Sequence, residues 1–402
     1  MSTSAVQTGR EVKLKVSASP RQDPPVAARR AVAAVFLING TLGAGWATRI
    51  PAIQQHLHLD PRALGLALLG AAVGALVAMN LAGYLAARWG SSRVTVTAGL
   101  LFCASVPLLA LAPSLLALVG ALVFFGATTG SMDVAMNTQG VAVERRYGRP
   151  ILTSFHAFFS IGGLTGAFLS GIATGHGVQP LPQFLAMAGL AAAGLLAASR
   201  FLLPAVADAG GSTVAFAFPT GALLILGAIG FCSVLGEGAI ADWSAIYLLH
   251  NVGTGAALAA GGYAAFSLLM AAGRFAGDGL TVRFGPVIMV RLGASMAALG
   301  LSLALLIQWT PVALFGFGLV GAGFSAIFPI VLSAAGRARG MASGNAIAAV
   351  ATCGYVGYLI GPPSIGFIAQ AASLRAALSV VVILSLVAAV LAPVVRSRPS
   401  EE

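Results

Sequence analysis

Long runs of apolar residues without a charge are the feature that most constrains the fold of this chain. The stretch LLALVGALVFFGATTGSM, residues 115–132, contains no Asp, Glu, Lys or Arg, and similar runs recur along the sequence. A helix needs about 20 apolar residues to cross the hydrocarbon core of a bilayer. Only 8% of the 402 residues are charged, whereas about one quarter are charged in a typical soluble domain. The runs are continuous rather than alternating, so an outer-membrane barrel is excluded. The sequence predicts an all-α, polytopic membrane protein.

Twelve segments are predicted to be transmembrane helices. Their approximate ranges are 31–53, 63–87, 94–112, 114–138, 150–174, 182–200, 220–248, 256–277, 286–307, 311–334, 344–370 and 374–394. The Pro-, Gly- and Ala-rich segment 201–219 is predicted to be a cytoplasmic linker between an N-terminal six-helix bundle, 31–200, and a C-terminal six-helix bundle, 220–396. The basic segment 1–30 predicts a disordered cytoplasmic tail, and 397–402 a short second tail.

The distribution of arginine predicts that both termini are cytoplasmic. Cytoplasmic loops of membrane proteins carry an excess of Lys and Arg. With both tails inside, the cytoplasmic loops hold Arg88, Arg93, Arg145, Arg146, Arg149, Arg200, Arg283, Arg337 and Arg339. The opposite loops hold only Arg49, Arg62 and Arg375. The positions of the basic residues therefore explain the net charge of +11 by orientation in a lipid bilayer. No nucleic acid is expected as a partner.

The two halves resemble each other at a shift of 195 residues. This shift aligns several glycines of the two halves. It also aligns the end of the second span with the end of the eighth. The pairs are Leu85 with Leu280, Arg88 with Arg283, Gly90 with Gly285, Gly126 with Gly321, Gly162 with Gly357, Gly166 with Gly361 and Gly171 with Gly366. Parallel repeats with a site at their interface are typical of alternating-access transporters.

One motif connects this repeat to a known family. The segment GYLAARWGSSRV, 83–94, follows the second span, and DGLTVRFG, 278–285, occurs at the corresponding place in the second half. Both resemble the loop signature of the major facilitator superfamily, roughly G-x-L-x-D-R-x-G-R-R. The resemblance covers about residues 30–396 and implies cytoplasmic gate loops. It assigns to those loops Gly83, Arg88, Gly90 and Arg93 in the first half, and Asp278, Arg283 and Gly285 in the second. The acid of the signature is replaced by Ala87, which predicts a weaker cytoplasmic latch unless Asp278 and Arg274 compensate.

Within the superfamily, the chain is similar to the fucose-permease-like branch of sugar/proton symporters and its uncharacterised bacterial relatives. The segments that carry this similarity are GWATRIPAI, MDVAMNTQG, FHAFFSIGGLTGA and GYVGYLIGPPSIGFIA. The branch implies a proton-coupling carboxylate in the fourth span, where Asp133 stands with Asn137 four residues later. It can carry a second acid in the first span, where this chain has Asn39.

Asp133 is also singled out by physical chemistry. A charge inside a membrane span usually faces a cavity or a partner, and Asp133 shares a helix face with Asn137. Counting from the helix ends predicts that His156 lies at a similar depth in the fifth span and can pair with Asp133. A carboxylate packed for structure is the alternative to a protonatable site.

The seventh span carries two acids, in the segment GEGAIADW. Glu237 lies between two glycines and is the second coupling candidate. Asp242 and Arg49 occupy matching places near the outer ends of the seventh and first spans, which predicts an outer-gate salt bridge. Trp46 and Trp243 lie at the same depth, where a tryptophan is an interfacial anchor or a stacking platform for a sugar. The predicted substrate-binding residues are Asn39, Trp46, Asn137, His156 and Trp243.

Several chemistries find no support in the sequence. No P-loop of the form GxxxxGK[ST] occurs, and no nucleophile–base pair or metal-ligand spacing is present. We therefore expect no enzyme activity, no cofactor and no metal. The prediction is a monomeric secondary transporter of a bacterial cytoplasmic membrane that moves a small, polar, sugar-like solute by alternating access, coupled to protons. An exporter of drugs or secondary metabolites is the first alternative, and a non-transporting membrane sensor is the second.

Overall fold

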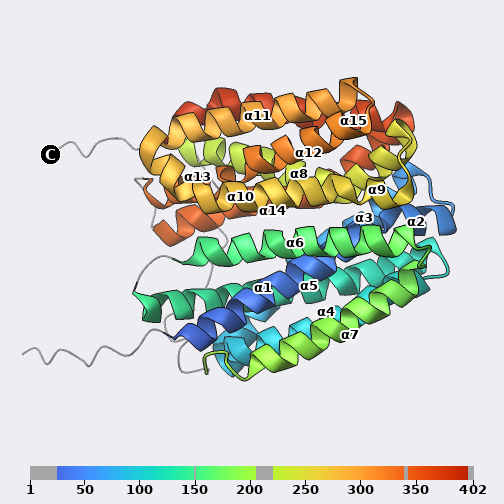
Figure 1. Cartoon of the computed structure of the whole chain (residues 1–402). Helices are drawn as coiled ribbons and strands as arrows, with labels where there is room; N and C mark the ends of the chain where they lie inside the picture. Colours follow the sequence, from blue (N-terminus) through green and yellow to red (C-terminus); the bar gives the residue numbers. More distant parts are fainter. Residues whose placement is uncertain (1–24, 149–150, 205–220, 339–342, 397–402) are drawn as a thin grey trace, which may run out of the picture.

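A computed structural model of the chain describes residues 25–148, 151–204, 221–338 and 343–396. The described residues form helices joined by short turns, without a strand. The helices from α1 to α7 form one bundle and those from α8 to η3 form a second bundle beside it (Figure 1). The predicted linker lies mostly in 205–220, and the predicted tails mostly in 1–24 and 397–402, outside the described residues.

The observed helices follow the predicted spans closely. Their bounds are α1 Val26–Ala47, α2 Ile50–His56, α3 Pro61–Trp89, α4 Ser91–Leu111, α5 Leu115–Tyr147, α6 Leu152–Gly175, α7 Pro180–Ser199, α8 Ala222–Tyr247, η2 Leu248–Val252, α9 Ala256–Ala259, α10 Gly261–Phe284, α11 Pro286–Leu306, α12 Thr310–Phe324, α13 Ile327–Gly336, α14 Ser343–Ala371, α15 Leu374–Leu391 and η3 Ala392–Val395. Within the described ranges, eleven helical segments are long and apolar enough to cross a membrane. The 29-residue α14 stands where the remaining span, 344–370, is predicted.

Three predicted spans are each broken into two helices. In the eighth span, α9 ends at Ala259 and α10 begins at Gly261. Prolines explain the breaks in the first and tenth spans. Pro51 lies in the first turn of α2, just after α1 ends. In the tenth span, α12 ends at Phe324 and α13 begins at Ile327. Proline has no backbone N–H to donate, so Pro329 leaves the carbonyl of Ser325 without its helical partner, at the position of this break.

The bundle has two distinct ends, which we name by what they carry. The end where α1 begins and η3 finishes is the terminal end, and the end that carries α2, η2 and α9 is the far end (Figure 1). At the terminal end, Gly90 alone separates α3 from α4, and Gly285 alone separates α10 from α11. Both have positive φ, +91° and +81°, which favours glycine.

The sequence repeat appears as repeated helix packing. A Cβ at Gly126 of α5 would collide with the carbonyl oxygen of Ala71 in α3, and one at Gly321 of α12 with that of Phe266 in α10. Gly126 and Gly321 are 195 residues apart, and so are their partners Ala71 and Phe266. These glycines let the helix backbones approach closely, as small residues do in membrane proteins.

At the far end, the two halves touch through a second pair of related contacts. A Cβ at Gly366 of α14 would lie 2.5 Å from the carbonyl oxygen of Pro61 and 3.0 Å from Cα of Gly65 in α3. One at Gly171 of α6 would lie 3.1 Å from the carbonyl oxygen of Ala257 in α9. The far end of the bundle is therefore closed on both sides by backbone-to-backbone contacts.

Candidate functional site

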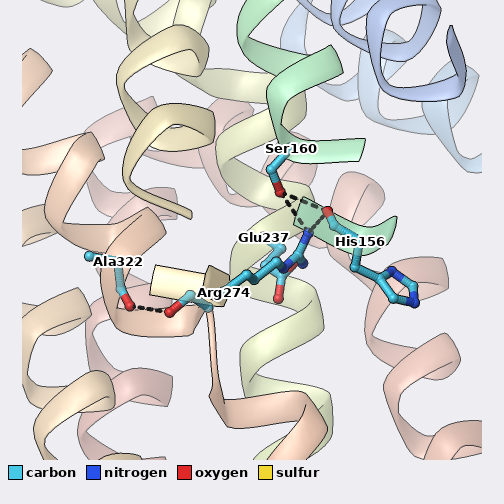
Figure 2. A network of polar contacts seen from close by, with 6 residues as sticks. His156, Ser160, Glu237, Arg274 and Ala322 are labelled. Carbon is cyan, nitrogen blue, oxygen red and sulfur yellow. Dashed lines mark hydrogen bonds and ion pairs between the residues drawn. The ribbon is translucent and has the colours of Figure 1, made fainter. Parts of the chain in front are cut away.

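Arg274, near the middle of α10, links the two halves (Figure 2). One terminal nitrogen, Nη2, lies 3.7 Å from a carboxylate oxygen of Glu237 in α8. The other, Nη1, donates to the hydroxyl oxygen of Ser160 at 2.7 Å and to the backbone oxygen of His156 at 3.3 Å, both in α6. A cation of the second half is thus held between an acid of its own half and two oxygens of the first.

These charged groups keep some accessible surface although they lie inside the bundle. The side chain of Arg274 is 16% exposed and that of Glu237 is 28% exposed. Burying an ion in an apolar medium without compensation is costly, and this exposure gives water access to both groups. Toward the terminal end, a cavity of about 240 Å³ begins beside them, with Arg274, Arg29, Ser154 and Asp278 in its wall.

Asp133 and Asn137 form a second polar group, on α5. The Asn137 amide donates to the Asp133 side chain at 3.2 Å and to its backbone oxygen at 2.9 Å. Asp133 is partly exposed. Tyr355 of α14 lies within electrostatic range of Asp133. Asp133 therefore faces the second half.

The predicted pairing of Asp133 with His156 is wrong. From Asp133, α5 continues to Tyr147, about 21 Å of helix at 1.5 Å per residue, whereas α6 begins only about 6 Å before His156. Phe155 instead packs level with Gly140, two turns beyond Asp133. The His156 ring contacts Phe36 edge to face, with the ring centroids 5.3 Å apart. Figure 2 shows this ring pointing away from Arg274, so only the backbone of His156 joins the network.

Asp242 lies one helical turn beyond Gly238 on α8. A Cβ at Gly238 would lie 3.6 Å from the ring of Tyr358 in α14, so Tyr358 covers this face of α8. Tyr358 and Tyr263 of α10 both lie within electrostatic range of Asp242. Within the described parts of the chain, no Lys or Arg nitrogen is within 4.0 Å of the Asp242 carboxylate.

The predicted salt bridge between Arg49 and Asp242 is not formed. The Arg49 side chain is directed into the first half, where its Nε donates to the Gln183 side chain at 2.7 Å and an Nη to the backbone oxygen of Val178. Gln183 in turn donates to the hydroxyl of Ser170 at 2.6 Å. Arg49 is 5% exposed. It ties α6 and α7 to the break between α1 and α2, and it is not a gate between the halves.

This arrangement gives a prediction for Arg49. Replacing Arg49 with alanine leaves the Gln183 side chain without a buried donor, and we expect a loss of about 1–3 kcal/mol in the free energy of unfolding. Because Arg49 and Asp242 share no partner, their effects should add to within about 0.5 kcal/mol. Thermal unfolding of both single variants and the double variant measures this. A larger coupling energy would support the outer-gate salt bridge between Arg49 and Asp242 after all.

Trp46 and Trp243 are both buried, so neither is an interfacial anchor. Trp46 is 4% exposed and its ring lies 6.2 Å from that of Phe125. Trp243 is fully buried, and its indole N–H has no partner among the described residues. The interpretation as interfacial anchors was wrong because position along a helix gives depth but not the direction in which a side chain points. A substrate-binding role for the two tryptophans stays a prediction.

Asn39 lies on the face of α1 that turns away from α6 and α7. Ile38 contacts α7 at Gly194, and Gly40 packs on α6 at Phe159, which leaves Asn39 on the other side with Gly43 and Trp46. Asn39 is 3% exposed and its amide nitrogen has no partner within the described residues. A Cβ at Gly43, one turn further along, would meet no atom within 4 Å.

The predicted gate loops are helix ends. Gly83 and Arg88 belong to the last turns of α3, where the Arg88 guanidinium donates to the Tyr84 hydroxyl at 3.0 Å. Arg93 is exposed at the start of α4. Asp278 and Arg283 occupy the matching end of α10, with the Arg283 guanidinium 5.3 Å from the Phe284 ring centre.

Sequence reasoning missed Arg274 as the centre of the network. It stands in the predicted span 256–277, whose other members are uncharged. A lone cation in a membrane span is itself a signal of a site. Among the described residues, no group of three or more His, Cys, Asp or Glu side chains is arranged to hold a metal ion.

Comparison with known proteins gives a consistent result. A family model described as Major Facilitator Superfamily matches residues 32–344. An uncharacterised MFS-type transporter of Yersinia pestis is 38% identical over 354 residues, which cover 88% of this chain and 92% of the relative. Membrane protein MosC of Rhizobium meliloti is 35% identical over 364 residues, covering 89% and 88%.

Solved structures share the fold at low sequence identity. The nucleoside transporter NupG superposes with a TM-score of 0.71 at 13% identity, covering 94% of this chain and all of the other. A single-residue variant of the E. coli fucose:proton symporter FucP gives a TM-score of 0.62 at 15% identity, covering 93% and 100%.

Proposed function

This chain belongs to the major facilitator superfamily, and we propose that it carries a small, polar, sugar-like solute across the membrane by alternating access coupled to protons. It is a multi-pass membrane transporter and not an enzyme. The relatives named above are bacterial, so the proposed location is a bacterial cytoplasmic membrane. The arginine distribution supports a cytoplasmic position for the terminal end.

The observation that carries proton coupling is the pair of carboxylates at the interface between the halves. Asp133 of α5 faces α14 of the other half, and Glu237 of α8 shares Arg274 with α6 of the other half. Both are partly exposed. A carboxylate in such a place can change its protonation state when access to water changes sides.

Protonation of Glu237 has a direct effect on the link between the halves. An ionised Glu237 attracts Nη2 of Arg274 while Ser160 holds Nη1, so Arg274 is shared between the two halves. A neutral Glu237 loses most of this attraction, and Arg274 is then held by the oxygens of α6. The protonation state of one acid thereby changes the balance between contacts within the second half and contacts across the interface.

The state of the structure fits one stage of an alternating-access cycle. The far end is closed by the contacts at Gly366 and Gly171, and a cavity lies on the terminal side of Arg274. With the terminal end cytoplasmic, this is the inward-facing state. The sugar-like substrate class is supported by likeness to the branch of fucose:proton symporters and by the amides and tyrosines at the interface.

The test is solute-evoked proton movement in proteoliposomes containing an entrapped pH dye, with transport current recorded in parallel on a solid-supported membrane. Monosaccharides, amino sugars, sugar acids and hydrophobic cations are added in turn. We expect a sugar to acidify the lumen with wild-type protein and not with Asp133→Asn. The matched control is Asp60→Asn, because Asp60 is an exposed helix cap at α3 that asparagine replaces well.

The other outcomes favour other functions. A response to hydrophobic cations alone would support the exporter, and solute uptake without proton movement would make the protein a facilitator. Binding without any uptake would support a sensor. Proton movement unchanged by Asp133→Asn would remove Asp133 from the coupling mechanism.

A further inference from the structure

Asp242 of α8 is a carboxylate for which the described residues supply neither a cation nor an amide. Glu237 has Arg274, and Asp133 has the amide of Asn137. Asp242 is partly exposed and, within the described residues, has no ion pair and accepts no hydrogen bond. An ionised carboxylate in a membrane protein needs such a partner, so a bound proton or a cationic ligand is left to neutralise its charge.

Aromatic rings from two other helices lie next to this carboxylate. Tyr358 of α14 covers the face of α8 at Gly238, one turn before Asp242, and is itself 41% exposed. Tyr263 of α10 lies within electrostatic range of Asp242. A carboxylate close to tyrosine rings is a favourable site for an ammonium group, because a cation over a ring gains from the ring quadrupole as well as from the charge.

The first half carries an unpartnered donor on α1. The amide of Asn39 is buried and, among the described residues, unpaired on the face of α1 turned away from α6 and α7, and the space beside Gly43 is open. Such a donor suits a solute hydroxyl group. Polar groups of this kind left unpaired in a buried site disfavour solutes that lack a matching atom.

We propose that Asp242, Tyr263 and Tyr358 bind the ammonium group of a hydroxylated amine such as an amino sugar, with Asn39 contacting a hydroxyl of the same solute. This inference rests on the proposed function and narrows its substrate class from polar solutes to cationic ones. The three carboxylates and single arginine named above make the interface a poor environment for a sugar acid.

Direct binding tests the charge requirement. Purified protein at pH 6.5 is titrated in a calorimeter with glucosamine, galactosamine and mannosamine, and with glucose and N-acetylglucosamine, which lack the ammonium. We expect at least one amine to bind roughly 10- to 100-fold more tightly than both neutral sugars. Asp242→Asn should remove this preference, and Asp60→Asn should keep it.

Further variants separate binding from folding. Asp242→Glu keeps the charge and should retain a preference for the amine even if Asp242→Asn folds poorly. Tyr358→Phe should bind like wild type, and Tyr358→Leu should bind roughly two- to fivefold more weakly, since only the ring contributes to the attraction.

The inference is overturned if none of the three amines binds, if neutral sugars bind as tightly, or if a well-folded Asp242→Asn keeps the preference. Its failure is distinct from failure of the proposed function. Amine binding without proton movement would contradict coupling and support this site. Proton-coupled uptake of neutral sugars, unchanged in Asp242→Asn, would support proton coupling and contradict this site.

Discussion

Arg274→Gln is expected to reduce transport at least tenfold and to destabilise the protein. The variant leaves Glu237 without its cation and breaks the hydrogen bonds to Ser160 and to the backbone of His156. Removing one partner of a fully buried ion pair costs about 3–5 kcal/mol. We expect about 1–2 kcal/mol here, because the Glu237 side chain is 28% exposed and water screens its charge.

A double-mutant cycle measures the interaction itself. Arg274→Gln and Glu237→Gln are combined, and thermal unfolding is followed for each variant. We expect a coupling energy of about 0.5–3 kcal/mol, with the double variant more stable than the sum of the single effects. Arg291→Gln is the matched control, since Arg291 is an exposed arginine of α11 and should change little. Additive effects would show that Arg274 and Glu237 do not interact.

The second large effect is expected at Gly366. A leucine there cannot fit, since even its Cβ would lie 2.5 Å from the carbonyl oxygen of Pro61 and 3.0 Å from Cα of Gly65. The far end of the variant should therefore open. Cysteine labelling measures this, with Tyr355→Cys introduced into a background in which Cys103, Cys232 and Cys353 are replaced. An impermeant maleimide added from the far side should react about tenfold faster in Gly366→Leu, the change expected when the closed state loses about 1.4 kcal/mol.

Two further substitutions make this experiment specific. Gly171→Leu acts on the related contact with Ala257, which is looser at 3.1 Å, and should give a smaller increase. Gly189→Leu is the control, because Gly189 is exposed on α7 and a Cβ there meets no atom within 4 Å. Equal labelling in all four proteins would mean that the far end closes by other contacts.

The helices could be predicted from the sequence because each depends on its own residues. Length and hydropathy are local properties, so α3, predicted at 63–87, is observed at Pro61–Trp89. The repeat was equally visible, because close packing requires glycine at fixed positions, as at Gly126 and Gly321. Family membership followed from these patterns together with the motif at 83–94.

The partners of the polar residues could not be predicted in the same way. Arg49 and Asp242 match in depth under the repeat, but the direction of a side chain around its helix depends on neighbouring helices. Arg49 turns toward Gln183 of α7. For His156 the error was in depth, because α5 extends beyond its predicted end at 138 to Tyr147. Arg274 and Glu237 are 37 positions apart, and only the fold brings them together.

The shape of α3 has a mechanical consequence. It is an unbroken helix of 29 residues, with no proline after its first turn, and Pro61 and Gly65 lie at its contact with α14. At 1.5 Å per residue it is a stiff lever about 43 Å long. A tilt of about 10° around that contact would displace Gly90, at the opposite end, by about 7 Å. α14 carries Pro362 and Pro363 beside the same contact. The contact therefore joins a stiff helix, α3, to a helix that can bend at its prolines, α14. Small rearrangements at the far end are thereby amplified into wide movements at the terminal end.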